Sequence, residues 1–262
     1  MRHRCGRSPQ APRASRAEGW TPTRSYRNAA PRGGDASTRR RQRDGELGAH
    51  LERGRLALRA LALLLRLIRL ALAPCSPFSV TPELMQRTLK FAKDHGLLIH
   101  THLAETLDEE KFCIKRFGML HVQYMEILCW LDPLSWLAKC VHLLPEEIKN
   151  MGEICCGVSR FPSSNMRLGS GISPIREMLN EGVRVGLGVD GSASNDSSNM
   201  LLEMRNAMLL SRLRDQEQWL TAREVLRLAT RGGAEVLGRE DIGQIVPGKQ
   251  ADLALFRIDG VD

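Results

Sequence analysis

The sequence predicts an α/β fold in which helices cover a parallel sheet, either an open sheet or a (β/α) barrel. Two observations predict it. From about residue 68 onward, short apolar runs alternate with longer segments of helical periodicity. The apolar runs are hydrophobic on both faces, as parallel strands buried between helices must be.

The predicted strands are five apolar runs, each of which ends in a polar segment or in one that contains proline or glycine. They span residues 68–73, 97–103, 136–143, 156–159 and 183–189.

Helices are predicted between these runs and after the last one. The first follows Thr81, a residue type that caps helix N-termini, and begins with Pro82, which suits the first turn. The predicted helices span residues 82–94, 108–117, 145–151, 174–180, 198–214 and 221–237. After them, residues 243–258 are expected to form two short strands around a Pro247-Gly248 turn.

The N-terminal segment differs sharply from the rest of the chain. Residues 1–70 hold 17 arginines, no lysine and five acidic residues, a balance of +12, whereas the whole chain has a net charge of +8 and its globular part is therefore mildly acidic. Residues 1–54 lack an apolar period, so we expect them to be disordered. Four explanations account for this composition: a transit peptide, an RNA-binding arm, a plain solvated tail, or translation in an unintended reading frame.

Residues 56–73 have the length of a membrane span, but Arg59, Arg66 and Arg69 interrupt it. Charges at the centre of a span are costly, so no transmembrane span is expected. Two interpretations stay open: a basic amphipathic helix at a membrane surface, or a buried strand over residues 68–73 alone.

Overall composition excludes several classes of protein. Of the 262 residues, 42% are hydrophobic and 26% charged, which is ordinary for a globular protein and not for a collagen or a multi-span membrane protein. The seven cysteines are an odd number without a CxxC pair. We therefore expect reduced thiols and a cytoplasmic location.

Polar residues that follow the predicted strands are the candidate site. His100, His102 and Glu105 follow one strand, His142 ends the next, and Asp190 ends the last. Because functional groups gather at the carboxyl ends of parallel strands, these residues could hold a divalent metal and move protons to and from its water. The alternative is that each histidine bonds within the core and Asp190 caps a turn.

Several segments, in the same order and at matching spacing, resemble the amidohydrolase superfamily, and within it the purine and triazine aminohydrolases, most closely the 8-oxoguanine deaminases. These segments are His-Thr-His-Leu-Ala-Glu-Thr (100–106), Cys-Val-His-Leu (140–143), Phe-Pro-Ser-Ser-Asn-Met-Arg-Leu-Gly-Ser-Gly (161–171) and Gly-Leu-Gly-Val-Asp-Gly-Ser-Ala-Ser-Asn-Asp (186–196), with 73–82 and 243–256.

The resemblance implies a partial (β/α)8 TIM-like barrel that holds about strands four to eight. Three regions follow: a disordered basic segment (1–54), a barrel part (55–238) and the return of a small β-sandwich (239–262). A barrel with about five strands has two exposed edges, so the chain is expected to act as a truncated domain that is marginally stable or pairs with another copy.

The resemblance also implies a function and a set of roles. The implied enzyme is a hydrolase that releases ammonia from the cyclic amidine of a small, purine-like, guanine-type substrate, with one zinc per chain. His102 and Asp190 match metal ligands, Glu105 matches the proton shuttle, and Asp190 and His142 match further catalytic residues. Asn165 and Arg167 lie in the loop after the seventh strand, where they either face the substrate or only form the loop.

Three departures from the family pattern weaken this expectation. No His-x-His pair precedes residue 100, Lys139 stands where relatives have a histidine, and Arg160 stands where relatives often have another. Two remaining ligands are too few for a tight zinc site, and added positive charge opposes a cation. We therefore expect weak zinc binding and little or no deamination.

A second class of function stays open, in which the chain is a non-catalytic interaction protein. Its basic arm would bind nucleic acid or an anionic membrane, with a salt dependence typical of phosphate contacts. The acidic balance of the globular part makes nucleic acid the less favoured partner.

Overall fold

The computed structural model describes residues 69–215 and 217–256. The chain divides into two units, Met1–Arg69 and Leu70–Asp262, and the description concerns the second. The predictions for the segment 1–54, for its boundary with residue 55 and for a basic helix before residue 69 lie outside the described residues.

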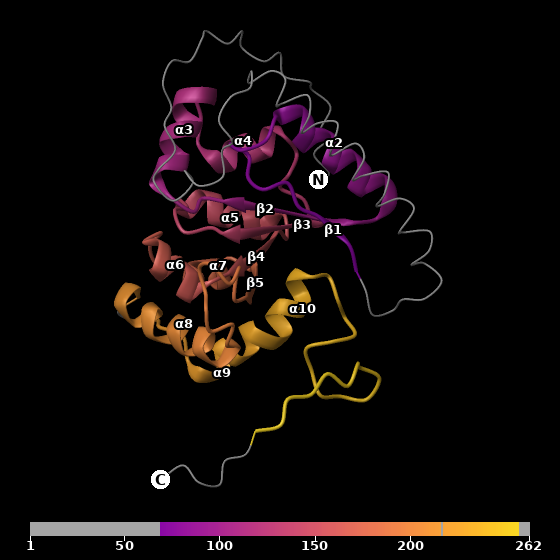
Figure 1. Cartoon of the computed structure of the whole chain (residues 1–262), viewed down its shortest axis with the longest axis vertical. Coiled ribbons are helices and arrows are strands. Elements are labelled where there is room, and N and C mark those ends of the chain that lie inside the picture. Colours follow the sequence, from indigo (N-terminus) through magenta and orange to yellow (C-terminus); the bar gives the residue numbers. More distant parts are fainter. Residues whose placement is uncertain (1–68, 216, 257–262) are drawn as a thin grey trace. The chain divides into compact units, whose positions relative to one another are not determined.

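A five-stranded parallel sheet forms the centre of the domain (Figure 1). Its strands lie side by side in chain order, and each pair is joined by a helical crossover, which parallel pairing requires. The strands are β1 (Ala71–Leu72), β2 (Leu98–Leu103), β3 (Ser135–Lys139), β4 (Gly157–Arg160) and β5 (Arg184–Leu187). All five predicted strands are present, which confirms the predicted α/β fold.

The described helices agree with the predicted ones in order, with two additions. They are α2 (Pro82–His95), α3 (Leu107–Phe117), α4 (His121–Ile127), α5 (Pro145–Glu153), α6 (Pro162–Leu168), α7 (Ile175–Asn180), α8 (Met200–Arg214), α9 (Ala222–Arg227), η2 (Leu228–Gly232) and α10 (Gly233–Val236). Helices α4 and α6 were not predicted. The predicted helix 221–237 is a single run in which η2 is a π-helical turn.

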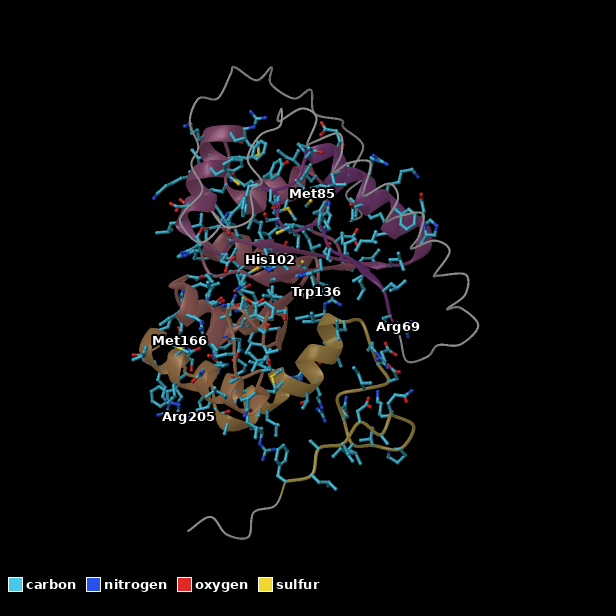
Figure 2. All side chains as sticks on the ribbon, viewed as in Figure 1. Arg69, Met85, His102, Trp136, Met166 and Arg205 are labelled. Atoms are coloured by element: carbon cyan, nitrogen blue, oxygen red, sulfur yellow. The ribbon has the colours of Figure 1, made fainter. Side chains whose placement is uncertain are left out.

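Helix α2 shows how local sequence sets an element's ends. The Thr81 side chain accepts a hydrogen bond from the Leu84 N–H, Pro82 occupies the first turn, and Gly96 ends the helix in the left-handed conformation. Met85 lies on the buried face of α2 (Figure 2). Its carbonyl accepts a hydrogen bond of 2.9 Å from the fully buried Trp130 indole, which ties α2 to the loop before β3.

The predicted strand 136–143 is too long, because β3 ends at Lys139. Lys139 and Cys140 have φ angles of 78° and 46°. A positive φ is incompatible with extended backbone and turns the chain away from the sheet. His142 consequently lies in the loop after the strand rather than at its end.

The two strands predicted after residue 243 are not formed within the described residues, which end at Phe256. This prediction is wrong for the described part of the segment. A strand needs a partner for its backbone N–H and C=O groups, and the segment leaves Ile245 and Leu255 largely exposed. No helix in the described part of the chain is long and apolar enough to cross a membrane.

The run α9–η2–α10 contacts β5 closely through two adjacent glycines. A Cβ on Gly232 would lie 2.2 Å from the Val185 carbonyl oxygen, whereas a Cβ on Gly233 would meet nothing within 4 Å. Gly232 therefore permits backbone-to-backbone contact, and Gly233 has no such constraint.

We predict opposite effects of alanine at the two glycines. Gly232→Ala should lower the free energy of unfolding by about 1–3 kcal/mol, because the helix must move away from β5. Gly233→Ala should leave it unchanged or raise it by up to about 1 kcal/mol, since alanine favours helix. Urea unfolding of both variants tests this, and equal effects would contradict the described contact.

Candidate active site

The candidate site lies where β2, β3 and β5 end, at the carboxyl edge of the sheet. The backbone there is strained: Ala104, Lys139, Cys140 and Asp190 all have positive φ angles although none is glycine. Such conformations persist only where surrounding contacts enforce them, and they are found at functional sites more often than elsewhere.

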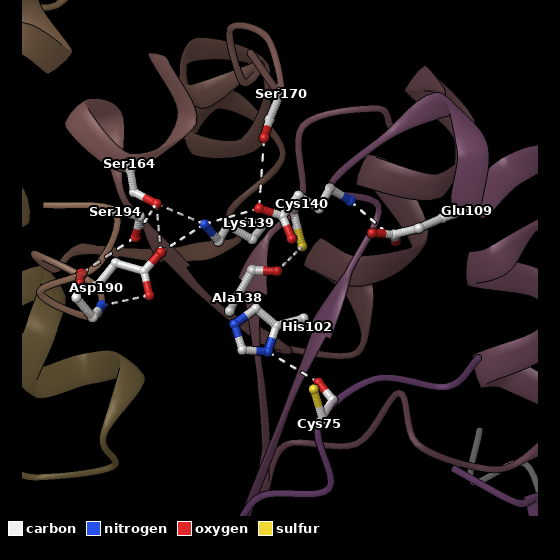
Figure 3. Close-up of polar contacts among 12 residues, drawn as sticks. Cys75, His102, Glu109, Ala138, Lys139, Cys140, Ser164, Ser170, Asp190 and Ser194 are labelled. Carbon is white, nitrogen blue, oxygen red and sulfur yellow. Dashed lines mark hydrogen bonds and ion pairs between the residues drawn. The ribbon is translucent and has the colours of Figure 1, made fainter. Parts of the chain in front are cut away.

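Lys139 is the centre of the site (Figure 3). Its side chain is only 2% exposed, and its Nζ lies 2.6 Å from Asp190 Oδ2 and 3.0 Å from Glu105 Oε1. The same ammonium donates a hydrogen bond of 2.9 Å to Ser164 Oγ. One buried cation therefore joins residues that follow β2 and β5 to a side chain of α6.

Asp190 is held ionised by its neighbours. Burial opposes its charge, but hydrogen bonds from Lys139, from Ser164 and from the Gly191 N–H outweigh this effect and lower the pKa of Asp190 to about 2. Ser164 donates its bond to Asp190 Oδ2 over 2.6 Å, and Ser194 Oγ lies 2.9 Å from Ser164 Oγ. The carboxylate is thus fully engaged by donors.

Glu105 is buried and is positioned from two sides. Its Oε1 faces Lys139 and lies 3.5 Å from Ser170 Oγ, while its backbone N–H donates to Glu109 Oε2 over 3.1 Å. Burial raises the pKa of Glu109 to about 7; the N–H of Glu105 opposes this rise, and the nearby Glu105 charge adds to it.

Three histidines surround this cluster, and each is bound to a carbonyl oxygen. His102 Nδ1 lies 3.0 Å from the Cys75 oxygen, and His142 Nε2 lies 2.8 Å from the Ser170 oxygen. A ring nitrogen that faces a carbonyl must carry the proton, so the other nitrogen of each ring has the lone pair. His100 stacks on Trp136 at a centroid distance of 3.6 Å, and burial lowers the pKa of His100 to about 4.

The two predicted substrate residues are in different surroundings, although both lie on α6. Asn165 is 2% exposed and faces a small hollow beside Arg160. The Arg167 side chain is half exposed and forms an ion pair of 3.0 Å with Asp196, in the loop after β5. The structure therefore brings Glu105 and Asp190 together through Lys139, and it places Asn165 beside Arg160 rather than in this ion network.

Sequence reasoning missed Ser164, Ser170 and Glu109. Glu109 has no clear sequence signal, because Glu105 lies in the loop before α3 and the spacing rule for helices does not apply to this pair. Ser164 has none, because helix α6 was not expected after β4.

The described residues do not fit a zinc ion. In the described ranges 69–215 and 217–256, no group of three His, Cys, Asp or Glu side chains is placed to hold a metal. Of the expected ligands, Asp190 is bound by an ammonium, which occupies the position of a cation beside it. Tetrahedral zinc sites need three or four donors, so His102 and Asp190 alone are insufficient.

Comparison with known proteins identifies the family. The profile of the amidohydrolase family matches residues 49–260. The chain belongs to the amidohydrolase family. It is 55% identical over 192 residues to 8-oxoguanine deaminase of Pseudomonas aeruginosa. The aligned residues cover 73% of this chain and 43% of that protein. It is 41% identical over 190 residues to 5'-deoxyadenosine deaminase of Methanothermobacter thermautotrophicus (72% and 44%).

Solved amidohydrolases and related hydrolases share the fold. A zinc-bound adenosine deaminase from Xanthomonas campestris has a TM-score of 0.75 at 30% identity, over 80% of this chain and 47% of that one. A zinc complex of atrazine chlorohydrolase from Arthrobacter aurescens has a TM-score of 0.70 at 39% identity, over 72% and 42%. The chain thus spans less than half the length of these relatives, and its five strands form part of a TIM-barrel amidohydrolase fold.

The buried ion network generates a first prediction for this amidohydrolase. Lys139→Met removes the cation but keeps the apolar stem, so the buried Glu105 and the partly buried Asp190 lose their partner. We expect the free energy of unfolding to fall by about 3–5 kcal/mol and the pKa of Asp190 to rise. Denaturant unfolding and carboxyl ¹³C NMR measure the two effects. A loss below about 1 kcal/mol would show that the network is not formed.

A second prediction concerns pH. Because the folded pKa of Glu109 is raised, its protonated form stabilises the fold at low pH, and this contribution is lost as pH rises from about 4.5 to about 7. Glu109→Gln keeps an oxygen for the Glu105 N–H and does not titrate, so it should flatten that decline. Glu110→Gln is the matched control and should leave the decline unchanged. The test is the free energy of unfolding of the wild type and of both variants, measured at a series of pH values. An equal decline in all three would contradict the prediction.

Proposed function

We propose that this chain binds a purine-like ring with the residues of a ring deaminase and hydrolyses its C–N bond slowly or not at all. The observation that carries the proposal is the Lys139 ammonium between Glu105 and Asp190. The deaminases among its relatives support the class of substrate.

Hydrolytic deamination requires groups that take a proton from water and give one to the leaving amine. A general base works best when its pKa is near the working pH. With a pKa of about 2 and three donors on its oxygens, Asp190 is a poor acceptor for a water proton. Glu105 is also held by the ammonium, so both proton-transferring carboxylates are engaged by one side chain.

Lys139 also opposes the metal that such a reaction uses in related enzymes. A divalent ion next to Asp190 would have to displace an ammonium at 2.6 Å and tolerate its charge. We therefore propose that the wild-type chain binds zinc only weakly, because His102 and Asp190 alone are too few ligands.

Substrate contacts are proposed for the accessible part of the site. Arg167 is half exposed and lies between the segments that follow β4 and β5, so we assign it to the edge of the ring. His142, with Nε2 fixed on the Ser170 carbonyl, keeps its Nδ1 lone pair for a substrate N–H. Asn165 is buried and is assigned to positioning α6.

The experiment restores a ligand at one position. Lys139→His in the full chain should bind zinc at least about tenfold more tightly than the wild type, because it adds a donor and removes a charge. Lys149→His, at an exposed position of α5, is the matched control. Zinc is measured by competition with a chromophoric chelator, ring binding by calorimetry with 8-oxoguanine, and turnover by ammonia release.

The wild type should bind the ring and release ammonia near the background rate. A wild-type chain that holds one zinc tightly and deaminates 8-oxoguanine efficiently would overturn the proposed slow turnover. Absence of ring binding in the wild type and in Lys139→His would overturn the proposed substrate class.

A further inference from the structure

Arg160 is a buried cation without a hydrogen-bond partner. Its residue is 2% exposed, and its Nε and Nη1 atoms have no partner among the described residues. Burying a charge without a partner costs several kcal/mol, so buried charges are paired in nearly all proteins. Arg160 forms no ion pair with the carboxylates of the proposed function, which bond to Lys139, although the charge of Glu105 attracts it.

A small hollow lies directly beside the Arg160 side chain. It has a volume of about 20 Å³ and is enclosed by the end of β4, helices α6 and α8, and the segment before α7. A polar cavity of roughly 10–15 Å³ is enough for one water-sized occupant. The hollow therefore has room for a single small particle and none for a substrate ring.

The two serines beside the hollow have no free hydroxyl hydrogen, so Arg160 and Asn165 are the side chains left to bind an occupant. Ser173 already donates to the Cys140 carbonyl, and Ser211 donates to the Met208 carbonyl. Asn165 has a buried Oδ1 atom without a partner among the described residues. Turning its amide over would present an N–H instead, since the two orientations of an amide are interchangeable in shape.

The electrostatic surroundings point the same way. Burial lowers the pKa of the Arg160 guanidinium to about 9, and the nearby charge of Arg214 acts in the same direction. The side chain is still protonated at neutral pH. A water molecule could satisfy its hydrogen bonds but would add no countercharge, and the Glu105 charge that acts on Arg160 is already paired with Lys139.

We propose that this hollow is a binding site for one monatomic anion of the halide class, chloride in particular, held by the Arg160 guanidinium and the turned amide of Asn165. A monatomic ion is close in size to the single water-sized occupant for which the hollow has room. The bound halide stabilises the contact of α6 and α8 with the end of β4.

The test is the halide dependence of unfolding of the full chain. Chloride replaces gluconate at constant ionic strength, and the midpoint of thermal unfolding is followed. A ligand that binds only the folded state raises stability by the same increment for each tenfold rise above its dissociation constant. We expect the wild-type midpoint to rise with chloride in this way, and bromide to act similarly.

Two variants assign the effect to the hollow. Arg160→Met should abolish the halide dependence. Arg205→Met removes the same charge from an exposed position on α8 (Figure 2) and should retain it. A wild-type midpoint that is independent of halide, or a dependence that Arg160→Met retains, would overturn the proposal and leave water as the occupant.

If Arg160→Met does not fold, diffraction from wild-type crystals grown in bromide tests the proposed site. An anomalous peak beside Arg160 Nε and Nη1 supports the site. Its absence overturns the proposal.

Discussion

The described domain depends on one buried ion network, in which the Lys139 ammonium joins Glu105 and Asp190. The two carboxylates follow strands that are far apart in sequence, and Ser164 of α6 adds a third bond to the ammonium. Because a buried charge is tolerated only while it is paired and hydrogen-bonded, each of these groups depends on the others. The network therefore fixes the carboxyl edge of the sheet, where the backbone is also most strained.

A second layer of contacts supports the first. The Glu109 carboxylate accepts a hydrogen bond from the backbone N–H of Glu105. Ser170 contacts the Glu105 carboxylate with its hydroxyl and bonds to His142 with its backbone carbonyl. Such contacts orient the side chains that they touch, which is how proton-transferring groups are positioned in active sites. In this chain the same arrangement holds both carboxylates on a lysine, which is the basis of the slow turnover that we propose.

Much of the fold could be predicted from the sequence because the strands are apolar on both faces. The meeting of Glu105 and Asp190 followed from the rule that parallel strands end at one edge. Lys139 was visible as a departure from the family pattern, but its bonds were not, because they depend on a side-chain conformation that spacing does not encode. Helix α6 was missed because it begins directly after β4, and the residue between them, Phe161, is not a capping residue type. The hollow beside Arg160 depends on packing between elements, which composition cannot reveal.

Residues 243–256 show the opposite error, in which a predicted element is absent. They have the residue types of strands but form no strand within the described part of the segment. Strand propensity expresses the fit of a side chain to a neighbouring strand, and without that neighbour it determines little.

The most direct test of the central claim is diffraction from crystals of the full chain grown with zinc, with data collected at the zinc absorption edge. The account predicts continuous density for the Lys139 side chain between Glu105 and Asp190, without an anomalous peak there. A zinc peak bound to Asp190, with the lysine displaced from both carboxylates, would contradict it.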